Sequence, residues 1–409
     1  MTSNFPRWEG DSTTPFVLNL AKDLQKLGWR IDVLAPHASG TKSREILGGI
    51  NVERFRYLWP ESLETVCYGG GALINLRKNK WNVVKVVPLV FFEWAAIARR
   101  LATRKYDLLH SHWILPQGFT GIFTARPLNI PHVVTAHGGD VFSLQGDMLA
   151  RFKKFTLHGA DAVTVNSSAT RKAVAEIAPN LTTIHTIPMG VSQPAPDPAS
   201  VARIRRRYRR EEEPLILFVG RLVHEKGVDD LIRAIAVLSA RNSDATAIIV
   251  GEGQDRSELE ALAQTLGVQE RIVFTGWVQP DEVVNYFSAA DIFAGPSKRA
   301  PSGWIEAQGL TFIEAMLVGT PVIATRTGGI VDSVRHEETG LLVDESAPEQ
   351  IAAAVTRLVS DPTLCERLTK SAAQLARDRF TRDTSAEAFS KLFSDMIDRH
   401  GVTSNSVMH

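Results

Sequence analysis

The sequence predicts an α/β protein with two successive domains, each built on a parallel sheet. Short apolar runs typical of buried strands alternate with amphipathic helical patterns along most of the chain. A loop with Pro188, Pro194, Pro196 and Pro198 interrupts the alternation, which then begins afresh. With 409 residues the chain is also long for one hydrophobic core. Two such domains imply a cleft between them, where ligands usually bind.

The first half contains the pattern of one sheet. An amphipathic helix is expected from Phe16 to Leu27, where Gly28 ends it. Strands are expected at residues 30–35, 107–110, 131–136, 161–165 and 182–187. Residues 1–6 look like the end of a strand with no strand before it. Either the first strand is missing or the assigned start lies too far downstream, and we favour the second explanation.

The second half repeats the alternation. Strands are expected at residues 215–219, 245–250, 271–275, 291–294, 321–324 and 340–343. Helices are expected between them at residues 229–239, 256–266 and 281–289, and from Ala347 to the end of the chain. This order predicts a second parallel sheet.

The composition argues against several classes of protein. The 46 basic and 45 acidic residues give a net charge of +1, so there is no overall attraction to nucleic acid. Cys67 and Cys365 indicate neither a disulfide scaffold nor a zinc site, and they fit a reducing compartment. We expect no signal peptide, and no uncharged apolar run reaches the ~18 residues that span a bilayer.

The most informative motif is a pair of glutamates, Glu306 and Glu314, with Gly309 between them. Because an apolar helical run follows and Gly319 ends it, Glu306 is expected in the loop before a helix and Glu314 inside that helix. Gly309 lets the backbone approach a ligand, and the unpaired N–H groups of a helix start attract anions. Carboxylates accept hydrogen bonds from sugar hydroxyls, so the motif suggests a sugar nucleotide. The alternative is an N-cap glutamate followed by a solvated one.

A basic loop follows the first strand of the second half. Gly220 opens it, and Arg221 and Lys226 lie at the carboxyl end of the strand, where they can meet a diphosphate. Such cations stabilise a departing nucleoside diphosphate without a metal. The sequence has no Asp-X-Asp triplet, the usual mark of a metal held against such a diphosphate. The alternative is a surface loop with ion pairs to Glu225.

Two strand ends of the first half carry histidines. His137 follows a strand, can donate to a substrate oxygen and is followed by two glycines, although a structural histidine is the alternative. Asp140 is expected only to cap the next helix. His110 and His112 have no third metal ligand at a suitable spacing, so a hydrogen-bonding cluster is favoured over a metal pair.

Two glycine segments remain in the second half. Gly251 and Gly253 would need a third glycine where Arg256 stands, which argues against a dinucleotide fingerprint. Gly276 and Trp277 belong to a segment whose backbone can contact a nucleotide base.

The segment at residues 77–105 is basic and aromatic, with Glu93 as its one acid. Such a segment is typical of a helix at a membrane surface, and a helix that packs on its own sheet is an equal alternative. Pro88 is expected to kink or start this helix. Its basic residues are Arg77, Lys78, Lys80, Lys85, Arg99, Arg100, Arg104 and Lys105, and its aromatic residues are Trp81, Phe91, Phe92 and Trp94.

Together these residues resemble the retaining glycosyltransferases of family 4, which have the GT-B fold. The resemblance covers nearly the whole chain and is strongest from Gly220 to Val343, where the Gly-Arg-Leu…Glu-Lys-Gly loop, the Glu-X7-Glu motif and Gly-Thr-Pro-Val-Ile-Ala all match. It implies two Rossmann-like domains that face an interdomain cleft. These would be an acceptor-side domain at 1–192, a nucleotide-sugar domain at 193–381, and a helix at 382–409 that crosses back and ends in a tail.

The resemblance also implies roles for the site residues. The catalytic residues would be His137, which contacts the transferred sugar, and Arg221, Lys226 and Glu306. The donor would bind to Gly220, Arg221, Lys226, Gly276, Trp277, Glu306, Gly309, Leu310, Thr311 and Glu314. Two departures are visible: Ala307 and Gln308 replace a glycine and an aromatic residue, and the loop at 8–11 lacks the usual paired glycines.

The implied activity is metal-independent transfer, with retention, from a UDP- or GDP-sugar to an acceptor, with no cofactor beyond the donor. The expected acceptor is a lipid-linked glycan in polysaccharide biosynthesis. The expected place is the cytoplasm, with peripheral contact at an anionic inner membrane face, and no nucleic acid partner is expected. Domain closure should bring His137 toward Glu306. The alternatives are a GT-B sugar-nucleotide epimerase and a non-catalytic sugar-binding protein.

Overall fold

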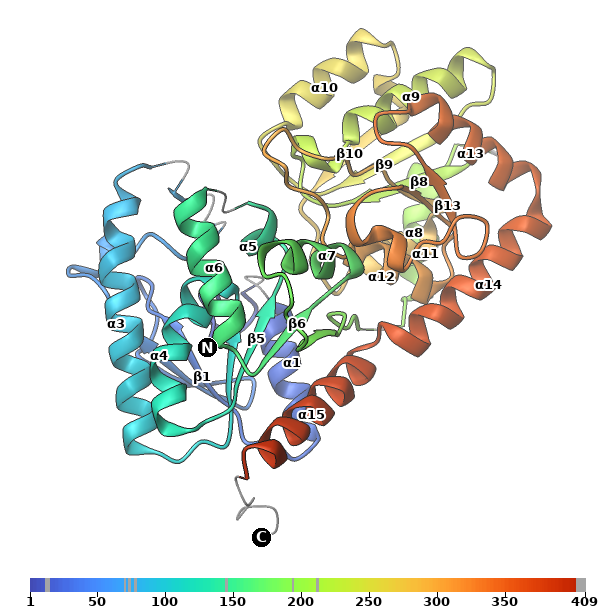
Figure 1. Cartoon of the computed structure of the whole chain (residues 1–409). Coiled ribbons are helices and arrows are strands. Elements are labelled where there is room, and N and C mark those ends of the chain that lie inside the picture. Colours follow the sequence, from blue (N-terminus) through green and yellow to red (C-terminus); the bar gives the residue numbers. More distant parts are fainter. Residues whose placement is uncertain are drawn as a thin grey trace. The chain divides into compact units, whose positions relative to one another are not determined.

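The structure, a computed structural model, describes residues 1–11, 15–69, 71–72, 75–76, 79–143, 146–192, 195–210 and 213–401. The chain divides into two compact units: unit 1 holds Met1–Gly190 and Arg382–His409, and unit 2 holds Val191–Thr381. Arg77, Lys78, Pro194 and the tail at 402–409, which take part in the sequence predictions, lie outside the described residues. Each unit is described by itself, with its elements labelled in Figure 1.

Unit 2 is built on a parallel sheet of six strands. They are β8 (Leu215–Val219), β9 (Thr246–Val250), β10 (Ile272–Gly276), β11 (Ile292–Gly295), β12 (Val322–Thr325) and β13 (Leu341–Val343). The order across the sheet is β10-β9-β8-β11-β12-β13, and every neighbouring pair is parallel. The order reverses between β8 and β11, so the loops after these two strands flank the topological switch point where ligands of such sheets bind.

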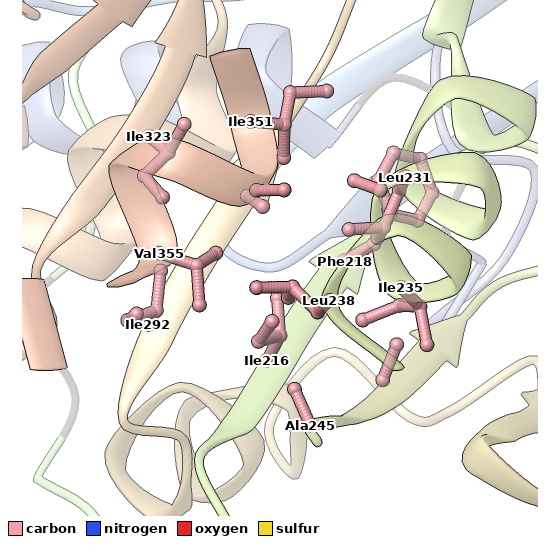
Figure 2. Close-up of a cluster of buried hydrophobic side chains, with 14 of the residues drawn as sticks. Ile216, Phe218, Leu231, Ile235, Leu238, Ala245, Ile292, Ile323, Ile351 and Val355 are labelled. Atoms are coloured by element: carbon pink, nitrogen blue, oxygen red, sulfur yellow. The ribbon is translucent and has the colours of Figure 1, made fainter. Parts of the chain in front are cut away.

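Helices cover both faces of this sheet. They are α8 (Pro198–Tyr208), α9 (Val228–Ala240), α10 (Arg256–Thr265), α11 (Val283–Ala289), α12 (Leu310–Val318), α13 (Pro348–Ser360) and α14 (Pro362–Arg379). Figure 2 shows the core on one face, where Ile216 of β8, Leu231 of α9 and Val355 of α13 belong to one buried cluster. On the other face, the rings of Phe293 and Phe312 lie 5.3 Å apart. The loops of the switch point therefore stand on a sheet that is packed on both sides.

Unit 1 contains two sheets. The first has the parallel order β4-β5-β6-β7, with β4 at Leu109–His112, β5 at His132–Ala136, β6 at Ala162–Val165 and β7 at Ile184–Thr186. The second has the order β1-β3-β2, with β1 at Asp32–Pro36, β2 at Arg44–Leu47 and β3 at Ile50–Phe55. β1 and β3 are parallel, whereas β2 and β3 form an antiparallel hairpin that the sequence analysis did not predict.

The helices of unit 1 are α1 (Pro15–Lys26), α3 (Asn82–Thr103), α4 (Phe119–Ala125), α5 (Gly139–Phe142), α6 (Asp147–Gly159), α7 (Ser168–Ile177) and α15 (Arg382–Arg399). α15 packs on α1, although the two helices stand at opposite ends of the sequence (Figure 1). Arg382 pairs with Asp23 of α1 at 2.6 Å, and Trp29 Nε1 donates to Ser390 Oγ at 2.8 Å.

The predicted strands of both halves are present, with ends that differ by at most two residues. In the part of the chain that the structure describes, no helix combines the length and apolar character needed to cross a bilayer. The α/β class and the two parallel-sheet units expected from the sequence are thus confirmed.

Candidate functional site

An ion pair joins two loops at the carboxyl end of the unit 2 sheet. Lys226 ends a short 3-10 helix (η4, His224–Lys226) after β8, and Glu306 lies in the loop before α12. Lys226 Nζ donates a hydrogen bond to Glu306 Oε2. The two side chains keep 21% and 13% of their exposure, so both remain within reach of a ligand. Lys226 Nζ also lies 5.8 Å from the centre of the Trp304 ring, within cation–π range.

The surroundings of Glu306 keep its carboxylate charged. Burial acts to raise the pKa of Glu306, but the charge of Lys226 and its hydrogen bond act to lower it, and the pKa lies below its usual value. The Gly309 N–H and the charge of Arg221 act in the same direction. Arg221, Lys226 and Glu306 therefore interact within one site, and Glu306 is an acceptor for hydroxyl donors.

Helix α12 begins directly behind this pair. Gly309, its N-cap, has φ of 76°, and a Cβ there would lie 2.6 Å from Phe312 Cδ2. Only glycine fits this position without strain. The partly exposed residues Leu310 and Thr311 form the first turn, whose N–H groups have no partner within the helix. The loop and helix positions expected of Glu306 and Glu314 are confirmed.

Glu314 has a different environment from Glu306. Its side chain is partly exposed on α12, and burial raises its pKa to about 7. A carboxyl of this kind changes its charge near neutral pH, and hydrogen-bond donors from a ligand would favour the charged form.

Two glycines support the basic loop from below. A Cβ at Gly251 would lie 1.9 Å from the Gly220 carbonyl oxygen, and one at Gly253 would lie 2.0 Å from that of Leu222. The Leu222 N–H donates to the Glu252 oxygen at 2.9 Å. The two glycines therefore allow a close backbone contact with the loop that carries Arg221. This contact explains why glycine stands at both positions without a dinucleotide fingerprint.

The segment expected to meet a base lies beside this loop. Gly276 has φ of 75°, and its oxygen accepts the Gly251 N–H at 2.9 Å. Trp277, the next residue, leaves 55% of its side chain exposed. Its open ring and the adjacent backbone can receive a flat ligand group.

The sequence analysis missed two supports of the site. A Cβ at Gly328 (φ 55°) would lie 2.0 Å from the Glu306 oxygen, and the Gly329 N–H donates to that oxygen at 2.9 Å. Lys298, with 7% of its side chain exposed, bonds Asp229 at 2.8 Å and Asp230 at 3.0 Å at the start of α9. The pair of glycines after strand β12 could have indicated the first support from the sequence. No pattern in the sequence indicates the contacts of Lys298.

His137 belongs to unit 1 and follows β5. Its Nε2 lies 2.9 Å from His112 Nδ1, and one of these nitrogens donates to the other. The Trp113 and Phe16 rings lie 4.9 and 5.1 Å from its ring. Burial lowers the pKa of His137 to about 3, so the ring is neutral and serves as a hydrogen-bonding group. Trp113 has φ of 75°, a strained conformation for a tryptophan and typical of functional sites.

The other polar groups at these strand ends are structural. Asp140 lies inside α5, whose N-cap is Gly138, so the expected capping role was wrong; its carboxylate instead accepts the N–H groups of Ile114 at 2.8 Å and of His137 and Gly138 at 3.1 Å, and so holds the loop before the helix. His110 Nε2 lies 2.6 Å from Thr135 Oγ1, so the predicted hydrogen-bonding cluster is present. Among the described residues, no group of three or more His, Cys, Asp or Glu side chains is arranged to hold a metal ion.

Helix α3, with Trp81 as its N-cap, makes up most of the segment at 77–105. Its inner side packs on unit 1 through Leu89, Ile97 and the buried Glu93, which accepts from Gln117 at 2.7 Å. Its outer side exposes an apolar surface, which we call the α3 face: Trp81, Val83, Val84, Val87, Phe91, Phe92 and Trp94. The packing on its own unit is therefore present on the inner side, and contact of the outer side with a membrane stays a prediction. Carboxylates of unit 1 hold the basic residues near the end of the helix, since Arg99 and Arg100 pair with Glu53 and Arg104 pairs with Asp32.

Comparison with known proteins agrees with this geometry. Residues 14–193 match the family model Glycosyltransferase Family 4, and residues 201–375 match Glycosyl transferases group 1. The D-inositol 3-phosphate glycosyltransferase of Acidothermus cellulolyticus is 31% identical over 326 residues, which cover 74% of this chain and 71% of that protein. The GDP-mannose-dependent alpha-(1-6)-phosphatidylinositol monomannoside mannosyltransferase of Mycobacterium tuberculosis is 38% identical over 206 residues, 50% of this chain. The match spans only 54% of that relative's own length.

Solved structures show the same fold. Sucrose-phosphate synthase from Thermosynechococcus elongatus has a TM-score of 0.73 at 24% identity, with 94% of this chain and 93% of that one covered. The Anabaena protein HepE, in complex with UDP-glucose, has a TM-score of 0.72 at 21% identity, with 97% and 100% covered. Given these matches, the chain belongs to the family 4 glycosyltransferases and has their GT-B fold.

Proposed function

We propose that this protein transfers a sugar from a nucleoside-diphosphate sugar to an acceptor with retention of anomeric configuration. The observation that carries the proposal is the Lys226–Glu306 pair beside the start of α12. It offers a cation for a diphosphate, a carboxylate for sugar hydroxyls and free N–H groups for phosphate oxygens in one place.

Donor binding would rearrange this pair. The diphosphate would become the partner of Lys226 and Arg221, and Glu306 would accept hydrogen bonds from the donor sugar. Glu314 would do the same for the ribose, and the Gly276–Trp277 segment would receive the base. The low pKa of Glu306 supports this role, because an ionised carboxylate is an acceptor only.

The chemical step would need no metal. The bond between the anomeric carbon and the phosphate oxygen breaks, and the acceptor oxygen forms its bond on the same face. The departing phosphate oxygen takes the proton of the acceptor hydroxyl, and Arg221 and Lys226 stabilise its charge. The neutral His137 would donate a hydrogen bond to the transferred sugar, which fits its low pKa.

The donor base is the first question for experiment. One relative named above is GDP-mannose-dependent, and the HepE structure contains UDP-glucose. We expect a UDP- or GDP-sugar to raise the melting temperature, since a ligand that binds only the folded state stabilises it. A thermal-shift panel of UDP, GDP and ADP sugars, with excess chelator, tests this. No shift with any donor, or a strict metal requirement, would contradict the proposal.

Transfer is favoured over the two alternatives. Both family models and both relatives are glycosyltransferases by name. The complete set of Arg221, Lys226, Glu306 and Glu314 argues against a non-catalytic sugar-binding protein. Release of nucleotide that depends on an added acceptor would support transfer, whereas conversion of the donor sugar without an acceptor would support epimerisation.

The acceptor is proposed to be a lipid-linked glycan at an anionic, cytoplasmic membrane face, as in polysaccharide synthesis. The α3 face supplies seven exposed apolar residues, with the exposed Lys80 beside them. The neighbouring helices α4 and α6 add exposed aromatic rings at Phe123, Phe152 and Phe155, together with the exposed Arg151 and Lys154. Aromatic groups with interspersed cations suit the headgroup region of anionic lipids.

A further inference from the structure

His112 and His137 meet at the ends of two neighbouring strands of unit 1. His112 is the last residue of β4, and His137 follows β5, the parallel neighbour of β4. His112 Nδ1 lies 2.9 Å from His137 Nε2, and the planes of the two rings differ by only 17°. The N–H bond and the lone pair of an imidazole both lie in the plane of its ring. Nearly parallel rings therefore allow a straight hydrogen bond between these two nitrogens.

The main chain of His137 is held separately from its ring. Its N–H donates to Asp140 Oδ1 at 3.1 Å, and its oxygen accepts from Asn166 Nδ2 at 3.3 Å. Within the described part of the chain, His112 is the one hydrogen-bonding partner of the His137 imidazole. The direction of this one hydrogen bond therefore decides which nitrogen of His137 carries the proton.

Two arrangements of protons satisfy the contact. Both rings are neutral because burial lowers the pKa of each, so each ring has a single N–H. In the first arrangement, His112 Nδ1–H donates to His137 Nε2, and His137 carries its proton on Nδ1. In the second, His137 Nε2–H donates to His112 Nδ1, and His112 carries its proton on Nε2.

The surroundings of His112 favour the first arrangement. His112 is only 5% exposed, and its Nε2 makes no hydrogen bond to any residue that the structure describes. The second arrangement would leave an N–H group at this buried place without an acceptor, which is rare in folded proteins, whereas the first leaves only a lone pair. The His137 residue is partly exposed, so an N–H on its Nδ1 can reach a ligand.

We propose that His112 is a positioning residue, which donates from Nδ1 to His137 Nε2 and so keeps the proton of His137 on Nδ1. The inference rests on the proposed function, since it gives His137 an N–H for an oxygen of the transferred sugar. Without His112, the proton of His137 would be divided between its two nitrogens. Part of the protein would then meet the sugar with a lone pair in place of a donor.

NMR can identify the tautomers of both rings without any substrate. In protein with isotope-labelled histidine, the two-bond couplings between ring protons and ring nitrogens distinguish an Nδ1–H ring from an Nε2–H ring. We expect the Nδ1–H pattern for both rings of the wild type, with the signals assigned by their loss in His112→Leu and His137→Gln. In His112→Leu, the His137 ring should become a mixture of tautomers. An Nε2–H pattern at His137 in the wild type would overturn the proposal.

Turnover separates the tautomer from the packing of the side chain. His112→Leu fills a similar space without a polar group and should lower kcat at least about tenfold, because the imidazole loses the group that fixes its tautomer. His112→Asn carries an amide N–H near the place of Nδ1 and should keep kcat within about threefold of the wild type. His158→Ala, at an exposed histidine of α6, is the control and should keep full activity.

Two further conditions exclude a general loss of structure. Turnover is compared well below the melting temperature of each variant, and the affinity for free nucleoside diphosphate should not change, because the residues proposed to bind it belong to unit 2. Full turnover in His112→Leu, or an equal loss in His112→Leu and His112→Asn, would overturn the role of His112. No transfer by the wild type with any donor would instead contradict the proposed function, and NMR would still decide the tautomer.

Discussion

The ammonium group of Lys226 and the carboxylate of Glu306 bond each other, although 80 positions separate them in the sequence. The pair ties the loop after β8 to the loop before α12, on the two sides of the topological switch point. The ion pair thus keeps the two side chains close together, and the proposed donor would replace it with contacts to its diphosphate and its sugar.

Replacement of Lys226 tests the cation. We expect Lys226→Ala to lower kcat about 10²- to 10³-fold, because one preorganised partner of the leaving diphosphate is lost. The measurement is nucleotide release at saturating donor. Lys370→Ala, at an exposed lysine of α14, is the matched control and should keep full activity. Full turnover in Lys226→Ala would remove this residue from the mechanism.

Glu314 should give the stability of unit 2 a pH dependence of a definite sign. Because burial raises its pKa from 4.5 to about 7, the folded protein holds a proton that the unfolded chain loses between these values. The contribution of Glu314 to the free energy of unfolding is fully present below about pH 4.5 and is lost as the pH rises to about 7. The free energy of unfolding in urea should fall between pH 4.5 and pH 8. We expect this fall to be about 1–2 kcal/mol smaller for Glu314→Gln than for the wild type, after allowance for solvent screening. The exposed Glu366→Gln should leave the decline unchanged.

Gly309 and Gly319, at the two ends of α12, form a matched pair of test positions. Both have positive φ, at 76° and 84°, but an added Cβ meets Phe312 at 2.6 Å in the first case and only Thr369 at 3.7 Å in the second. Both alanine variants should lose about 1 kcal/mol from backbone strain. Gly309→Ala should lose more because of the steric overlap, and it alone should weaken donor binding at least about tenfold in calorimetry. Equal donor affinity in the two variants would argue against a ligand at the start of α12.

The α3 face should control membrane contact. We expect the wild type to float with vesicles that contain anionic lipid and to do so less at high salt, since cations contribute to binding. Phe91→Ser with Trp94→Ser should reduce the floated fraction at least about tenfold. Ile46→Ser removes a residue that is 72% exposed on β2 and should have no effect. Wild-type protein that stays in the soluble fraction with every vesicle would contradict the membrane proposal.

The sequence was sufficient for most of the parallel strands because many of them, such as β5 and β9, are short and largely apolar runs in which every residue is buried. It was insufficient for the β2–β3 hairpin, whose strands are partly exposed and carry charges at Arg44, Glu45 and Glu53. Gly48 and Gly49, with φ of 55° and 86°, form the two-residue turn between Leu47 and Ile50. A Gly-Gly pair between alternating residues was an available signal for this hairpin.

In the candidate site too, some residues could be placed from the local sequence and others could not. Motif spacing placed Glu306 before α12 and Glu314 within it, because helix starts and stops are local properties of the sequence. The support of Lys298 by Asp229 and Asp230 depends on strands that are neighbours only in the folded sheet, so no local pattern could reveal it. The roles proposed for Arg221, Lys226, Glu306 and His137 stay predictions until the variants are measured.

The close backbone contacts of Gly251 and Gly253 with the Gly220–Leu222 loop restrict how this protein can be re-engineered. In a library that varies residues 220–227 alone, every variant loop would still pack against Gly251 and Gly253, which fit the backbone of the parent loop. Grafts that exchange donor preference with another protein should therefore transplant residues 251–253 together with the loop, as a single cassette.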